Sequence, residues 1–176
     1  AAGEAVTVLD TAEVANVDFH TFPNGCHIAE VEIDPETGVV SVVRYAVFDD
    51  VGKAVNPLIV RGQVQGGVAQ GFGQAAMEQV VHDRESGQPL TGSWMDYAMP
   101  RADELPALSL ISRPTASPLH PLGIKGAGAA AAAGAPPAVM NALADALAPL
   151  GVRHLDMPAT PFAVWRAIEA ARARQA

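Results

Sequence analysis

The chain has 176 residues, of which 49% are hydrophobic, and this suffices for one ordinary domain with its own core. A net charge of -8 argues against a nucleic-acid-binding protein, which would carry a basic face. The single cysteine, Cys26, excludes an internal disulfide and favours a reducing, cytoplasmic setting. No apolar run approaches the length that spans a bilayer, and no signal peptide is visible.

The first half of the chain predicts a β-hairpin followed by a helix. Residues 1–20 are weakly patterned, and we expect residues 21–176 to form a single domain. Two β-rich runs, 26–34 and 39–48, flank Asp-Pro-Glu-Thr-Gly at 34–38, which is turn chemistry. Asn56 and Pro57 predict the N-cap and first residue of a helix that continues to about residue 79.

The second half predicts short strands and two more helices. We expect a strand to start over 80–82 and a short strand over 108–112, with a loop at 94–100 between them. A helix is expected over 137–150, with Pro136 and Pro137 in its first turn. The last helix is expected over 160–174, with one apolar face made of Phe162, Trp165 and Ile168. Interleaved strands and helices predict an α+β fold with a mixed, largely antiparallel sheet packed with helices.

A loop of glycine and alanine at residues 122–135 is the most informative segment. It carries one charge, Lys125, and its glycines Gly126 and Gly128 allow backbone angles that other residues resist. Such a loop can hold a phosphate-bearing or pterin-like cofactor near a helix N-terminus. A buried tight loop between packed elements is the alternative, which the composition alone favours.

The predicted helix after Pro57 is rich in glycine and glutamine. Gln63, Gly67, Gln70 and Gln74 recur at helical spacing and share one face. That face offers amide donors and acceptors to a large polar cofactor. A helix of small residues packed tightly on a neighbour explains the spacing equally well.

Other reactive residues form weaker patterns. The five histidines show no metal-ligand spacing, so we expect no metal site made by side chains. Asp49 and Asp50 could form a carboxylate pair, although such a pair more often ends a strand. Asp96 fits a loop anchor better than a ligand contact, and Cys26 fits a buried free thiol.

Several segments, in order, resemble the C-terminal part of the large, molybdopterin-binding subunit of the xanthine dehydrogenase/aldehyde oxidase/carbon monoxide dehydrogenase family. The resemblance covers nearly the whole chain from about residue 20. Its motifs are Phe-Pro-Asn-Gly-Cys-His at 22–27, Val-Glu-Ile-Asp-Pro-Glu-Thr-Gly at 31–38, Asn-Pro at 56–57, Gly-Gln-Val-Gln-Gly-Gly-Val-Ala-Gln-Gly at 62–71, Met-Asp-Tyr-Ala-Met-Pro-Arg-Ala-Asp at 95–103, Pro-Leu-His-Pro-Leu-Gly-Ile-Lys-Gly-Ala-Gly at 118–128, Gly-Ala-Pro-Pro-Ala at 134–138 and His-Leu-Asp-Met-Pro-Ala-Thr-Pro at 154–161.

This resemblance implies the second molybdopterin-binding domain of a molybdenum hydroxylase, an oxidoreductase that hydroxylates a carbon centre with water. The cofactor is expected as the cytosine dinucleotide form. The positions that match the family's cofactor-binding residues are Gln63, Gly67, Lys125, Gly126, Ala127 and Gly128. Most members place a glutamate, the general base, directly after the last of these glycines. This chain has Ala129 there, and a methyl group cannot take a proton.

The resembled subunit is several times longer than this chain, so half of its cofactor pocket must come from elsewhere. The chain then is one domain of a longer enzyme, a split-gene product, or a degenerate paralogue. We expect an N-terminal molybdopterin-binding domain or subunit and iron–sulfur and FAD subunits or domains as partners. Alone, the chain is expected to be inactive and to hold no cofactor. The alternative is a non-catalytic structural or interaction domain, and we expect the exposed cofactor-facing side to self-associate.

Overall fold

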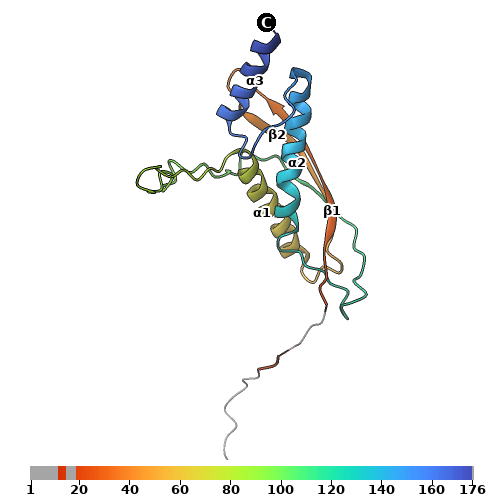
Figure 1. Cartoon of the computed structure of the whole chain (residues 1–176). Coiled ribbons are helices and arrows are strands. Elements are labelled where there is room, and N and C mark those ends of the chain that lie inside the picture. Colours follow the sequence, from red (N-terminus) through yellow and green to blue (C-terminus); the bar gives the residue numbers. More distant parts are fainter. Residues whose placement is uncertain (1–11, 15–18, 176) are drawn as a thin grey trace, which may run out of the picture.

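The computed structural model describes residues 12–14 and 19–175, which form a mixed sheet with helices packed on it (Figure 1). The three strands lie in the order β1-β2-β3, with β1 antiparallel and β3 parallel to β2. This arrangement confirms the predicted α+β class. The elements, in chain order, are β1 (Asn24–Ile33), β2 (Val40–Asp50), α1 (Pro57–Ala76), β3 (Ser109–Ser112), α2 (Ala130–Leu147), the 3-10 turn η1 (Ala148–Leu150) and α3 (Pro161–Gln175).

The predicted hairpin is confirmed as β1 and β2. Its turn is closed by the amide of Gly38, which donates to the carbonyl of Asp34 at 2.7 Å, while Gly38 adopts a φ of 73°. The Asp34 carboxylate also accepts from the Thr37 hydroxyl at 2.7 Å. These contacts are local, and the sequence of the turn therefore predicts them without knowledge of the rest of the fold.

The predicted start of α1 is also confirmed. The side chain of Asn56 accepts from the amides of Leu58 and Ile59 at 3.0 and 3.3 Å, which caps the helix. The helix ends at Ala76, three residues before the predicted end. Two of its glycines pack on α2: a Cβ on Gly67 would lie 2.7 Å from the Cβ of Ala131. Tight packing on a neighbour therefore explains Gly67 and Gly71, but not the exposed glutamines of α1.

Helix α2 differs from the prediction, because it begins at Ala130 rather than at Pro137. Pro136 and Pro137 lie inside the helix, where two amide donors are lost and an interior proline costs about 3 kcal/mol. Two factors offset this cost. The preceding residues are mostly alanine, the best helix former, and Pro136 is buried against Gly71 of α1.

Two smaller predictions are wrong, and the apolar face predicted for α3 is buried only in part. Residues 80–82 form no strand, since His82 makes only an isolated bridge with Pro89 in the segment that projects between α1 and β3 (Figure 1). Cys26 is exposed, because it lies on the outer face of β1. In α3, Ile168 is buried, whereas Phe162 is 63% exposed. The predicted apolar face of α3 is therefore covered only in part.

The core lies between the sheet and the helices. Its largest fully buried side chains come from β2, α1, α2 and α3: Val47, Val68, Val139, Leu143, Leu147, Val164 and Ile168. In Figure 1, α1 and α2 lie side by side over the hairpin, and α3 lies at the end of the sheet where β1 meets β2. Within the described residues, no helix has the length and apolarity that a membrane crossing requires.

Candidate functional site

The glycine–alanine loop is fastened to the end of β2 by Asp50. The Asp50 carboxylate accepts from the Lys125 ammonium at 2.7 Å, from the Gly52 amide at 2.8 Å and from the Thr115 amide at 3.0 Å. The Lys125 contact, followed by the two amides, holds the pKa of Asp50 well below its usual range. The Lys125 amide also donates to the carbonyl of Val51 at 3.0 Å. These bonds set the position of the loop relative to the sheet.

The pairing of Lys125 defines what its side chain contributes. Its ammonium is directed toward Asp50, and the side chain is only 12% exposed. Lys125 therefore anchors the loop, and its contact with a cofactor stays a prediction. The three residues that follow it expose their backbone instead, since Gly126 and Gly128 are both exposed.

The two loop glycines have open space around them. A Cβ on Gly126 would lie 3.9 Å from Pro23, and one on Gly128 would lie 4.0 Å from the Gln63 side chain. Neither glycine has a positive φ; in this loop only Gly123 does, at 68°. The expected reason for Gly126 and Gly128, a special backbone angle, is therefore wrong. The absence of a side chain at Gly126 and Gly128 instead leaves a backbone that a second molecule can approach closely.

The loop borders a hollow that we call the loop cavity, with a volume of about 450 Å³. It lies between the start of β1, the end of β2 and the start of α2. Its lining residues are Phe22, Pro23, Asn24, Gly25, His27, Asp49, Gly126, Ala127, Gly128, Ala129, Ala130, Ala133 and Gly134.

Ala129 occupies the N-cap position of α2, and its side chain makes no capping hydrogen bond. The first amides of an α-helix have no partner within the helix and carry partial positive charge. The uncapped end of α2 therefore faces the loop cavity with free donors. Such an end favours an anionic group.

The predicted amide face of α1 divides into two parts. Gln63, Gln70 and Gln74 are exposed, whereas Gly67 is buried against α2. The structure thus brings Gln63 beside Gly128 and takes Gly67 into the helix contact. Gln63 does not line the loop cavity itself, so it borders the loop from the side of α1.

A polar group made of His27, Tyr45 and Asp49, two of which line the loop cavity, was not predicted from the sequence. Nδ1 of His27 and the hydroxyl of Tyr45 form a hydrogen bond of 2.9 Å. Nε2 of His27 lies 3.8 Å from Oδ1 of Asp49. The other Asp49 oxygen, Oδ2, is buried without a partner. A Cβ on Gly134 would lie 2.9 Å from the His27 ring, so α2 packs directly on this group.

Burial shifts the pKa values of this group. It lowers the pKa of His27, raises that of Asp49 and raises that of Tyr45, while His27 and Asp49 each partly offset the shift of the other. Period-2 alternation along β2 could have placed Tyr45, Val47 and Asp49 on one face. The cross-strand partner, His27, needed the register of the hairpin.

The remaining candidates take structural roles. Asp50 ties the loop while Asp49 points toward the helices, so the two carboxylates do not form a pair. Asp96 accepts from the Ser93 hydroxyl at 2.5 Å, which supports its assignment as a loop anchor. Among the described residues, no cluster of three or more histidine, cysteine, aspartate or glutamate side chains could hold a metal.

Comparison with known proteins gives consistent relatives. The molybdopterin cofactor-binding domain family matches residues 3–106. The carbon monoxide dehydrogenase large chain of Hydrogenophaga pseudoflava is 38% identical over 85% of this chain, and the nicotine 6-hydroxylase large subunit of Paenarthrobacter nicotinovorans is 42% identical over 83%. The structure of CO dehydrogenase from Oligotropha carboxidovorans superimposes with a TM-score of 0.81, at 36% identity over 86% of this chain and 19% of that one. The chain spans only 18% of the length of the two curated relatives.

Proposed function

The chain belongs to the molybdopterin cofactor-binding domain family, and we propose that it is the second such domain of a molybdenum hydroxylase large subunit. The observation that carries this proposal is the loop cavity, where an exposed glycine–alanine backbone leads into the uncapped start of α2. The similarity to large subunits of carbon monoxide dehydrogenase and nicotine 6-hydroxylase supports it.

The residues present fit an anionic pterin cofactor. The free amides at the start of α2 suit its anionic part, and no side chain blocks approach to Gly126 and Gly128. Gln63, beside Gly128, supplies a neutral amide that donates and accepts. When bound, the cofactor supplies the metal centre for oxidative hydroxylation of a carbon with oxygen from water. The cytosine dinucleotide form belongs to this proposal.

The loop carries no side-chain base of its own. Ala129, at the position of the usual glutamate, is exposed and ends in a methyl group. Proton transfer at that position therefore has no donor or acceptor from this chain. This observation favours a second candidate, a non-catalytic structural or interaction domain that keeps the cofactor-binding fold.

The rest of the proposed assembly lies outside this chain. Its partners would be an N-terminal molybdopterin-binding domain or subunit together with iron–sulfur and FAD subunits or domains, in a cytoplasmic enzyme of the aldehyde oxidase and xanthine dehydrogenase type. Because the chain spans only 18% of the length of its curated relatives, the isolated chain is expected to hold no cofactor and to be inactive.

Metal analysis tests the binding proposal. We expect the purified chain to contain no stoichiometric molybdenum, and the chain assembled with the missing part of its large subunit to contain about one per complex. Replacing Gly128 by Val in the assembly should lower molybdenum content, because the side chain would fill the approach to the backbone. Val at Gly62, where nothing lies within 4 Å, is the matched control. An assembly that folds but takes up no molybdenum would contradict the proposal.

Position 129 separates the two candidate functions. In a molybdenum-loaded assembly, Ala129→Glu restores a proton acceptor, and general-base catalysis contributes about 10²- to 10⁴-fold to a rate. A hydroxylase that has lost only its base should gain activity of that order. No activity in a loaded assembly with glutamate at this position would favour the non-catalytic domain.

A further inference from the structure

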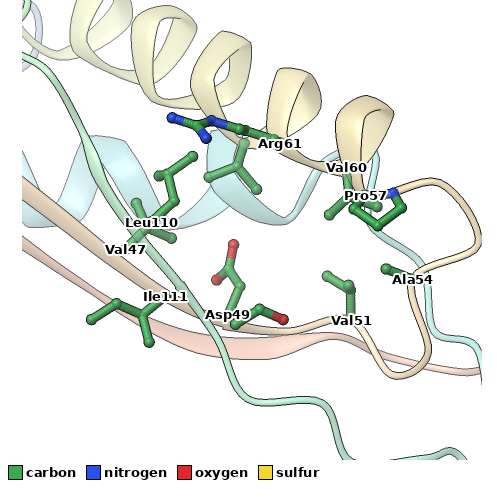
Figure 2. Close-up of a pocket in the computed structure, with 11 residues that line it drawn as sticks. Val47, Asp49, Val51, Ala54, Pro57, Val60, Arg61, Leu110 and Ile111 are labelled. Carbon is green, nitrogen blue, oxygen red and sulfur yellow. The ribbon is translucent and has the colours of Figure 1, made fainter.

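A second hollow, which we call the strand cavity, lies between α1 and the strands β2 and β3 (Figure 2). Its volume is about 180 Å³, well below the roughly 300 Å³ at which pockets for drug-sized ligands begin. The walls are mostly aliphatic: Val47, Val51, Ala54, Pro57, Val60, Val64, Leu110 and Ile111. Only a small molecule with an apolar middle fits such a space.

One carboxylate lies in this apolar wall. Figure 2 shows the Asp49 side chain pointing from β2 into the strand cavity. Asp49 is 8% exposed, and its Oδ2 has no hydrogen-bond partner. An unpaired buried carboxylate oxygen costs free energy unless a donor reaches it. The floor of the cavity therefore favours a hydrogen-bond donor, and a cationic donor most strongly.

The opposite charge stands on α1 across the cavity. Arg61 is exposed and lines the strand cavity, and in Figure 2 its side chain extends along α1 so that the guanidinium lies above Leu110. Within the described residues, no ion pair joins Arg61 to a carboxylate. The guanidinium is thus free to bind an anionic group at the mouth.

From this arrangement we propose that the strand cavity binds a small ω-amino acid, with its ammonium at Asp49 and its carboxylate at Arg61. The aliphatic wall between these two residues takes the methylene chain of the ligand. Opposite charges at the two ends set its orientation, since the reversed pose would place like charges together. The site is formed by this chain alone and goes beyond the binding of a pterin cofactor.

Binding of 4-aminobutyrate to the isolated chain tests the proposal. We expect saturable shifts of the methyl NMR signals of Val47, Val60 and Leu110, with a dissociation constant on the order of millimolar. n-Butylamine should bind more weakly, and 1-butanol more weakly still by about tenfold, because it offers only a neutral donor to Asp49. This order of affinities is measured on the unmodified chain. Equal affinity for the amine and the alcohol, or no saturable shift, would overturn the proposal.

Two variants assign the two charges, and two further variants serve as controls. Asp49→Asn should remove the advantage of n-butylamine over 1-butanol, and Arg61→Gln should remove that of 4-aminobutyrate over n-butylamine. Glu32→Gln, which removes an exposed carboxylate on β1, should change neither. Val60→Trp, which fills the cavity, should abolish all the shifts. Retention of the amine preference in Asp49→Asn would refute the assignment of the ammonium end.

Discussion

Gly71 lies where α1 contacts α2, and a single added methyl there tests how closely the two helices pack. An ideal Cβ on Gly71 would lie 2.5 Å from the Cβ of Ala135 and 2.8 Å from Cδ of Pro136. Both atoms are held close to the backbone of α2, so neither can turn away. The helices must then move apart, and overpacking of this kind costs about 1–3 kcal/mol.

Helix propensity acts in the opposite direction. Replacing glycine by alanine in a helix interior stabilises by about 1 kcal/mol. Gly66 lies in the same helix with nothing within 4 Å of its ideal Cβ position, so Gly66→Ala gains this term without a clash. Gly71→Ala gains the same term but carries the packing cost. We expect the two variants to differ in unfolding free energy by about the full overpacking cost.

Urea unfolding followed by circular dichroism measures both variants against the parent chain. Gly66→Ala should raise the free energy of unfolding above that of the parent chain. The free energy of unfolding of Gly71→Ala should lie at least about 1 kcal/mol below that of Gly66→Ala. In a thermal melt this corresponds to a difference of about 2–4 °C per kcal/mol for a domain of this size. Equal stability of the two variants would refute the close contact of α1 and α2 at Gly71.

Further predictions concern the loop anchor and the exposed cofactor-facing side. Because the folded pKa of Asp50 is depressed, its contribution to stability is present above the unfolded pKa of about 3.9 and is lost as the pH falls below it. Asp50→Asn should lower the melting temperature at pH 7 and flatten its fall between pH 4 and pH 2; an unchanged fall in acid would contradict this. The isolated chain should self-associate weakly through the side that carries Gln63 and Lys125, visible as a rise in sedimentation coefficient with concentration. A monomer at high concentration, or an interface that leaves Gln63 and the loop that follows Lys125 in solvent, would exclude it.

The local parts of the fold could be predicted because short segments of sequence determine them. Asn56 sets the start of α1 by accepting hydrogen bonds from the amides of residues 58–60, and the Asp34–Gly38 turn closes on itself. In each case the interacting groups lie within five positions of one another along the chain.

Long-range contacts decided the rest. Cys26 and His27 are neighbours in β1, yet Cys26 is exposed and His27 packs under α2, because strand residues alternate between faces. Lys125 pairs with Asp50 across 75 positions, and this pairing gives it the role of an anchor for the loop. The distant surface or side chain that each of these residues contacts has no signal in the local sequence.

By itself, the sequence determined the hairpin, the capped start of α1, the order of the motifs and the absence of a glutamate at Ala129. Only the tertiary structure decided where α2 begins and which polar groups are buried. The reason is physical: a cap or turn depends on hydrogen bonds between near neighbours, and its residues specify it directly. Burial of Asp49, and the cost of prolines inside α2, depend on which distant surface packs against them. That surface exists only once β2, α1 and α2 have come together.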